Sequence, residues 1–255
     1  MRGRGRYGIL GSILIAFMAL GTLQAQALET DTILKKVDAA EGFESSYSEV
    51  EQIITTSSGQ KRTLVVRGWA VNNGEKQLSE YLAPPDIKGQ RILMTDDGDN
   101  IWMFNPETRR TRKLGSHMKK KKVMGSDFTY EDQAGGKISE KYTGTVLREE
   151  EQGDVACYVM ELIPTPAGPS YDKLIAWIGK EDFLTRRVDY YQNGESEPFK
   201  RLILEDIHEA DGKLVAHSMT MTNLEDMTET VNKITRIQFN VDIPDSVFES
   251  RNLER

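Results

Sequence analysis

The residues best suited to bind another molecule lie between Asp99 and Asp132. A short aromatic stretch that contains Trp102 and Phe104 leads into a dense run of basic side chains. Those cations are Arg109, Arg110, Arg112, Lys113, Lys119, Lys120, Lys121 and Lys122. Each well-placed cation near anionic lipid contributes about 1 kcal/mol to membrane attraction. The run therefore predicts a docking surface for an anionic membrane or for an acidic face of a partner protein.

The same cations have a second interpretation. Successive side chains of an extended strand point to opposite sides, so the basic residues in 109–113 cannot all face one partner. Charged residues on an edge strand also prevent that edge from pairing with another sheet. A docking surface and a solvated, charged edge therefore both remain open from the sequence.

Catalytic motifs are absent from the sequence. It contains no Gly-x-Ser-x-Gly elbow, no His-Glu-x-x-His, no phosphate-binding loop and no dinucleotide fingerprint. His117, His208 and His217 are scattered, without metal-ligand neighbours at close spacing. Cys157 lies in the apolar run 155–159, which is typical of a buried and unreactive thiol. We therefore predict a protein that is not an enzyme and that needs neither a cofactor nor a metal ion.

One acidic run, Asp96-Asp97-Gly98-Asp99-Asn100, resembles the start of a calcium-binding loop. It lacks the glycine at the sixth position and the closing glutamate of the helix-loop-helix calcium site. The run therefore predicts a hairpin turn.

The first 27 residues have the pattern of a cleavable signal peptide. Arg2, Arg4 and Arg6 precede an apolar run over residues 9–23, and Ala25-Gln26-Ala27 supplies a cleavage site. The apolar run is shorter than the roughly 20 residues that a membrane span needs. We expect a mature chain, residues 28–255, in the periplasm of a Gram-negative envelope; a retained N-terminal anchor is the alternative.

Charge and cysteine content narrow the class of protein. The formal net charge of the chain is −7, and the predicted signal peptide removes three arginines and no acidic residue. A general nucleic-acid binder is usually basic, so nucleic acid is not an expected partner. Cys157 is the single cysteine, so no internal disulfide can form and a sizeable apolar core must stabilise the fold.

The pattern of the mature chain is mostly β. A helix is predicted over residues 31–41, and a short second helix is predicted to start at Ser126 or Asp127 and to end at Asp132. Between them and beyond, alternating runs are separated by turn pairs such as Asn193-Gly194 and Asp211-Gly212. This predicts one α+β domain over 28–255, a large curved antiparallel sheet with short helices over its concave, apolar face.

A sheet that curls without closing leaves an apolar hollow wherever the covering helices do not fill it. The candidate lining residues lie in the first half of the mature chain, and ordinary core packing is the alternative for each of them. They are Trp69, Leu82, Leu93, Trp102, Phe104, Met124, Phe128 and Tyr130.

Several blocks, taken in order, carry a family resemblance. Residues 81–89 read YLAPPDIKG, residues 101–106 read IWMFNP, and residues 124–132 read MGSDFTYED, with Ile243-Pro244 near the C-terminus. In this order they resemble the outer-membrane lipoprotein-sorting protein family, relatives of the periplasmic LolA/LolB-like lipoprotein carriers. The resemblance implies an open half-barrel of about eleven strands, an apolar cavity for acyl chains, and association with exporters of the resistance-nodulation-division (RND) type.

Three functional hypotheses follow. The first is a periplasmic carrier, expected to be a monomer, that binds a lipid or lipoprotein acyl chain and touches membrane surfaces transiently. The second is an accessory interaction module that docks on an envelope exporter or an outer-membrane acceptor through the basic run. The third is a sensor of misrouted lipoprotein in an envelope-stress response.

Overall fold

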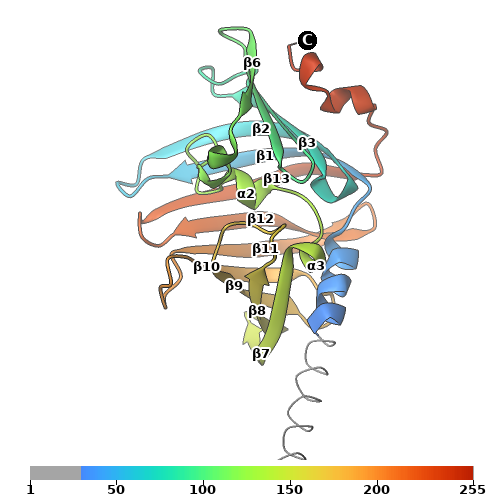
Figure 1. Cartoon of the computed structure of the whole chain (residues 1–255), viewed down its shortest axis with the longest axis vertical. Helices are drawn as coiled ribbons and strands as arrows, with labels where there is room; N and C mark the ends of the chain where they lie inside the picture. Colours follow the sequence, from blue (N-terminus) through green and yellow to red (C-terminus); the bar gives the residue numbers. More distant parts are fainter. Residues whose placement is uncertain (1–29, 255) are drawn as a thin grey trace, which may run out of the picture.

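The computed structural model describes residues 30–254, so the predicted signal peptide lies outside the described residues. Within that range, thirteen strands form one antiparallel sheet (Figure 1). The strands are β1 (Ser45–Thr55), β2 (Lys61–Val71), β3 (Lys76–Ala83), β4 (Arg91–Thr95), β5 (Asn100–Asn105), β6 (Arg110–Leu114), β7 (Tyr142–Gln152), β8 (Val155–Pro164), β9 (Lys173–Gly179), β10 (Thr185–Tyr191), β11 (Lys200–Ala210), β12 (Lys213–Asn223) and β13 (Thr228–Phe239).

The helices are short. An N-terminal helix covers residues 30–41 of the described range. The others are α2 (Tyr130–Gln133), α3 (Ile138–Lys141), and four 3₁₀ turns, η1 (Asn72–Gly74), η2 (Ser116–Lys120), η3 (Asp245–Phe248) and η4 (Ser250–Asn252). None of the helices between residues 30 and 254 is long and apolar enough to cross a membrane.

The connection between β6 and β7 is the feature that shapes this fold. The strand order is β6-β5-β4-β3-β2-β1-β13-β12-β11-β10-β9-β8-β7, so two strands that are consecutive in the sequence form opposite edges of the sheet. Residues 115–141, here called the crossover segment, must therefore span the sheet, and Figure 1 shows them passing over one face of it. We call the covered face the inner face and the opposite one the outer face.

Alternation along the strands assigns side chains to the two faces. In β5, Ile101 and Met103 pack in the cluster that includes Val123 and Tyr130 of the crossover segment. Their neighbours Trp102 and Phe104 pack instead in a cluster with the C-terminal residues Ile243, Val247, Phe248 and Leu253. The C-terminal segment therefore covers the outer face over β3 to β5.

The inner face carries two apolar clusters. One lies over the strands of the first half of the chain, where Leu64, Met94 and Ile101 meet the crossover segment. The other lies over β8 to β12, where the N-terminal helix inserts Ile33, Leu34 and Val37 and where Phe128 of the crossover segment also packs. Both clusters join residues that are far apart in the sequence, so neither half of the inner face is covered by local structure alone.

The predicted open, mostly β architecture with covering helices is confirmed, with thirteen strands in place of about eleven. The short second helix begins later than predicted, at Tyr130, because Thr129 caps it. The Thr129 side chain accepts from the backbone of Asp132, and the Asp132 side chain accepts from the backbone N–H of Thr129. Ser126 instead closes the preceding turn, because its backbone N–H donates to the Val123 carbonyl at 2.9 Å.

Candidate functional site

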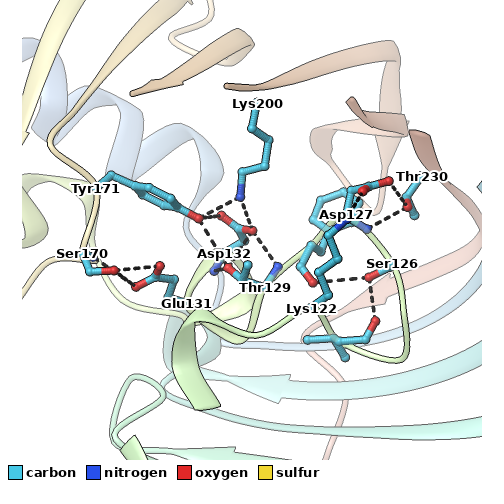
Figure 2. Close-up of polar contacts among 12 residues, drawn as sticks. Lys122, Ser126, Asp127, Thr129, Glu131, Asp132, Ser170, Tyr171, Lys200 and Thr230 are labelled. Carbon is cyan, nitrogen blue, oxygen red and sulfur yellow. Dashed lines mark hydrogen bonds and ion pairs between the residues drawn. The ribbon is translucent and has the colours of Figure 1, made fainter. Parts of the chain in front are cut away.

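Two buried carboxylates fasten the crossover segment to the sheet, as Figure 2 shows. The first is Asp127, whose side chain is 1% exposed. Its two carboxylate oxygens accept hydrogen bonds from Thr228 (2.6 Å) and Thr230 (2.9 Å) of β13. Its backbone N–H donates to the Thr230 hydroxyl at 2.9 Å, and Lys122 Nζ lies 3.0 Å from its Oδ1. This anchor fixes the middle of the crossover segment above β13.

The second anchor is an ion pair between Asp132 of α2 and Lys200 of β11. Lys200 Nζ lies 2.6 Å from Asp132 Oδ2, and the two side chains are 2% (Asp132) and 3% (Lys200) exposed. Tyr171 completes the cluster, because its hydroxyl donates to Asp132 Oδ1 at 2.7 Å and accepts from Lys200 Nζ at 2.7 Å. Every polar atom of this group therefore has a partner, as a buried pair requires.

Aromatic rings surround the Lys200 ammonium. Its Nζ lies 4.9 Å from the ring centroid of Tyr171, 4.5 Å from that of Tyr190 and 5.7 Å from that of Phe199. Burial lowers the pKa of Lys200 below its ordinary value, and the neighbouring Asp132 carboxylate opposes this shift. Burial raises the pKa of Tyr171 and Tyr190, and Asp132 adds to both shifts. A pre-formed charge pair thus sits in an otherwise apolar wall.

A cavity of about 550 Å³ lies beside this second anchor. Pockets that hold small molecules usually measure about 300–1,000 Å³. Its apolar lining comes from the end of the crossover segment, the start of β7, the loop before β9, and β9, β10 and β11. The residues are Ile138, Tyr142, Tyr171, Leu174, Val188, Tyr190, Leu202 and Leu204. Leu174, Val188 and Tyr190 are buried. These side chains form an apolar floor between α2, α3 and the sheet.

The solvent-exposed rim of the cavity is polar. It includes Asp96, Asp97 and Asp99 of the β4–β5 turn, Glu41 at the end of the N-terminal helix, and the charged residues Lys137, Glu140 and Lys141. Glu41 is tied to β10, because Thr185 N donates to Glu41 Oε1 at 2.9 Å. The β4–β5 turn is held close to the crossover segment at Gly98, where an added Cβ would come within 2.8 Å of the Ala134 Cβ. The rim is therefore assembled from three separate parts of the chain.

The eight residues predicted to line a cavity do not gather in one place. Met124 and Tyr130 pack over the first half of the inner face, and Phe128 packs over the second half. Four others lie in the cluster covered by the C-terminal segment; they are Trp69, Leu93, Trp102 and Phe104. Leu82 falls at a β-bulge between β2 and β3. None of the eight lines the 550 Å³ cavity, although Trp69 lines a more open one of about 460 Å³ on the outer face.

The basic run is divided between paired and unpaired cations. Lys119 forms an ion pair with Asp99 at 2.5 Å, and Lys122 bridges Asp127 and Asp226, each at 3.0 Å. Lys113 lies over the ring of Trp102 at 5.3 Å. Five further cations are exposed in the turn before β6, on β6, on η2 or directly after it; they are Arg109, Arg110, Arg112, Lys120 and Lys121. Docking through these residues stays a prediction.

Sequence reasoning missed Lys200, Tyr171 and the apolar residues of β9 to β11. One signal was present: Lys200 shares a face of its strand with Leu202 and Leu204, because side chains two apart point the same way. A lysine in an apolar register of a predicted strand indicates a buried partner of opposite charge. The partner itself, Asp132, is 68 positions away in sequence and could not be identified from spacing.

Comparison with solved structures shows which proteins share this fold. A domain named as an outer membrane lipoprotein-sorting protein from Vibrio parahaemolyticus is 24% identical, with a TM-score of 0.82, over 90% of this chain and 100% of that one. A DUF1329 family protein from Desulfovibrio piger is 21% identical, with a TM-score of 0.82, over 89% of this chain and 99% of that one. A LolA superfamily protein from Nitrosomonas europaea is 20% identical, with a TM-score of 0.72, over 86% of this chain and 97% of that one.

Comparison by sequence gives the family. No curated protein matches the chain. A family model whose description reads "uncharacterized protein" matches residues 73–255, which is most of the chain. The resemblance predicted from the blocks at 81–89, 101–106 and 124–132 is confirmed in the fold. The chain therefore belongs to this family of uncharacterized proteins and has the fold of the lipoprotein-sorting and LolA-superfamily proteins.

Proposed function

We propose that this protein carries a lipid or a lipoprotein acyl chain through the periplasm and holds the chain in the cavity under α2 and α3. The observation that supports the proposal is the 550 Å³ cavity with its apolar floor of Leu174, Val188, Tyr190, Leu202 and Leu204. The lipoprotein-sorting and LolA-superfamily names of its structural neighbours agree with this role. No catalytic step is part of the proposal.

The energetics of such a carrier set what the cavity must provide. Burial of an acyl chain is worth about 0.8 kcal/mol per methylene group, so a sixteen-carbon chain gains on the order of 13 kcal/mol when it leaves water. A carrier therefore needs an apolar space that competes with the membrane and a cover that opens. The crossover segment supplies such a cover. Its helices α2 and α3 are short, with four residues each.

Native mass spectrometry of the protein purified gently from its own envelope tests this proposal. We expect a fraction of the protein to carry a co-purified mass that tandem dissociation identifies as a lipid or as an acylated peptide. Protein that is consistently empty, and that also takes up no fluorescent fatty acid, would instead favour an accessory module of an exporter or a lipoprotein sensor.

We further propose that the unpaired cations of the basic run bring the carrier to anionic membranes. Arg109, Arg110, Arg112, Lys120 and Lys121 form no ion pair within 4.0 Å with any described residue. β6 is an edge strand of the sheet, so it pairs with β5 on one side and with no strand of the described sheet on the other. Attraction of unpaired cations to anionic lipid should weaken as salt screens it.

Sedimentation with phosphatidylglycerol vesicles tests the docking surface. Serine at Lys120 and Lys121 should reduce binding at low salt, and the reduction should disappear at high salt. A matched control places serine at Lys61 and Lys233, which are exposed and lie on β2 and β13, so that the net charge is the same. Equal loss in both variants would assign the effect to net charge and not to this surface.

A further inference from the structure

The rim of the cavity carries an excess of negative charge. Seven carboxylate side chains contribute to the lining of the cavity, against three lysines. The carboxylates are Glu41, Asp96, Asp97, Asp99, Glu131, Asp132 and Glu140, and the lysines are Lys119, Lys137 and Lys141. An acyl-chain cavity needs only an apolar floor, so the charge of its rim requires a separate explanation.

The protein's own groups already occupy the three lysines. Lys119 pairs with Asp99 at 2.5 Å, and Lys137 pairs with Glu140 at 3.2 Å. The Lys141 ammonium donates to the backbone carbonyl of Gly135, and burial lowers its pKa. Asp132 is neutralised in turn by Lys200. Each of these lysines therefore already bonds to a group of the protein, and Lys141 also interacts electrostatically with Asp97 and Asp99.

Four carboxylates remain after these pairs are removed. Glu41, Asp96, Asp97 and Glu131 form no ion pair within 4.0 Å with any residue between 30 and 254, although burial raises the pKa of Glu41 and so disfavours its charged form. Glu131 accepts hydrogen bonds from Ser170 N at 3.1 Å and from Ser170 Oγ at 2.9 Å, which fixes its position at the cavity. Hydrogen bonds from Asn100 and Thr95 lower the pKa of Asp96 and keep it ionised. A carboxylate has about four acceptor sites, so each of these groups can bind a further donor.

We infer that the cavity takes a long-chain lipid whose polar end is a protonated amine, with the chain on the apolar floor and the amine facing Asp97 and Glu131. This inference rests on the proposed function, because it specifies the cargo of the same cavity. The apolar floor supplies most of the affinity through burial of the chain, and it does not distinguish one polar end from another. The unpaired carboxylates Asp96, Asp97 and Glu131 supply the choice of charge, since they attract an ammonium and repel a carboxylate or a phosphate.

Three probes with the same chain and different ends test the inference: dodecylamine, dodecanoate and dodecanol. Each is titrated, as monomer at low salt and neutral pH, against protein loaded with the neutral fluorophore N-phenylnaphthylamine. We expect the amine to displace the fluorophore at about a tenfold lower concentration than the carboxylate, with the alcohol between them, as charge interactions of this size near a protein surface imply. High salt should bring the amine and the carboxylate close together.

A charge-neutralised variant assigns the preference to the rim. Asp97→Asn with Glu131→Gln should remove most of the difference between the amine and the carboxylate and leave the affinity for dodecanol unchanged. Glu107→Gln with Asp154→Asn is the matched control, because it removes two exposed carboxylates from turns outside the cavity and should keep the preference.

The outcomes separate the inference from the proposed function. Equal affinity for all three probes, tighter binding of the carboxylate, or a preference that survives Asp97→Asn with Glu131→Gln would overturn the inference and leave the carrier proposal standing. Failure of all three probes and of the fluorophore to bind would overturn both.

Discussion

The two halves of the inner face have similar strands under them but are filled differently. Over the first half, the crossover segment contributes Val123, Met124 and Tyr130, and the cluster that they join is closed. Over the second half, the crossover segment reads EDQAGGKISEK from residue 131 to residue 141, in which Ile138 is the one large apolar side chain. The cavity of about 550 Å³ lies under this polar, glycine-containing part. The hollow therefore lies where the crossover segment contributes a single large apolar side chain, although the N-terminal helix also packs over this half.

The buried ion pair at the edge of the open half should give the largest effect. Asp132→Asn leaves the Lys200 ammonium without its counter-charge among three aromatic rings, so we expect a loss of about 3–5 kcal/mol in the free energy of unfolding. Denaturant unfolding measures this loss.

The double variant Asp132→Asn with Lys200→Met should recover most of that stability, because it removes both charges. Costs that simply add in the double variant would show that the two side chains act independently, which contradicts the paired anchor.

Truncation of a leucine in each half compares their packing directly. Leu64 is fully buried in the closed half, so Leu64→Ala should cost about 2–5 kcal/mol. Leu204 lines the cavity, so Leu204→Ala enlarges an existing space and should cost roughly 1 kcal/mol. Denaturant unfolding of the two variants gives both values. Equal costs would mean that the open half is as tightly packed as the closed half.

Substitution of Tyr171 should have the smallest effect on the free energy of unfolding, and this effect should depend on pH. Tyr171→Phe removes the hydroxyl that bonds Asp132 and Lys200, so we expect a loss of about 1 kcal/mol at neutral pH. Because burial raises the pKa of Tyr171 above its ordinary value of 10.0, the folded state retains this proton while the unfolded state loses it. The contribution of Tyr171 is therefore fully present below about pH 10 and declines as the pH rises further.

Urea unfolding of the wild type and of Tyr171→Phe over a series of pH values checks this dependence. The difference in stability between the two proteins should shrink above about pH 10. A difference that grows with pH would contradict the assigned direction of the pKa shift.

The sequence predicted the class of fold and the covering segment but not the side that each residue faces. Alternating runs and turn pairs identified most strands, because those signals are local. The predicted cavity residues Trp102 and Phe104 lie on the outer face under the C-terminal segment, while their neighbours Ile101 and Met103 face inward. A shift of one residue exchanges the two faces of a strand, so alternation alone cannot say which set faces inward.

The second anchor shows why the rest of the site could not be predicted from the sequence. Asp132, Tyr171 and Lys200 meet only because the crossover segment spans the sheet between its two edge strands, and that path is set by the strand order. Neither the composition nor the spacing of these three residues contains the strand order. The block at residues 124–132 was identified correctly as part of the cover, since its resemblance depends on contiguous residues.

The central claim is that the hollow under the second half of the crossover segment holds an acyl chain. The most direct test compares two tryptophan variants on the same strand, Leu204→Trp, which fills the cavity, and Ile203→Trp, which points to the other face of β11. The account predicts that Leu204→Trp weakens uptake of a fluorescent fatty alcohol at least about tenfold, on the scale of two or more buried methylene groups, and that Ile203→Trp leaves uptake unchanged. Unchanged uptake by a folded Leu204→Trp protein would contradict the account, because the chain would then bind elsewhere.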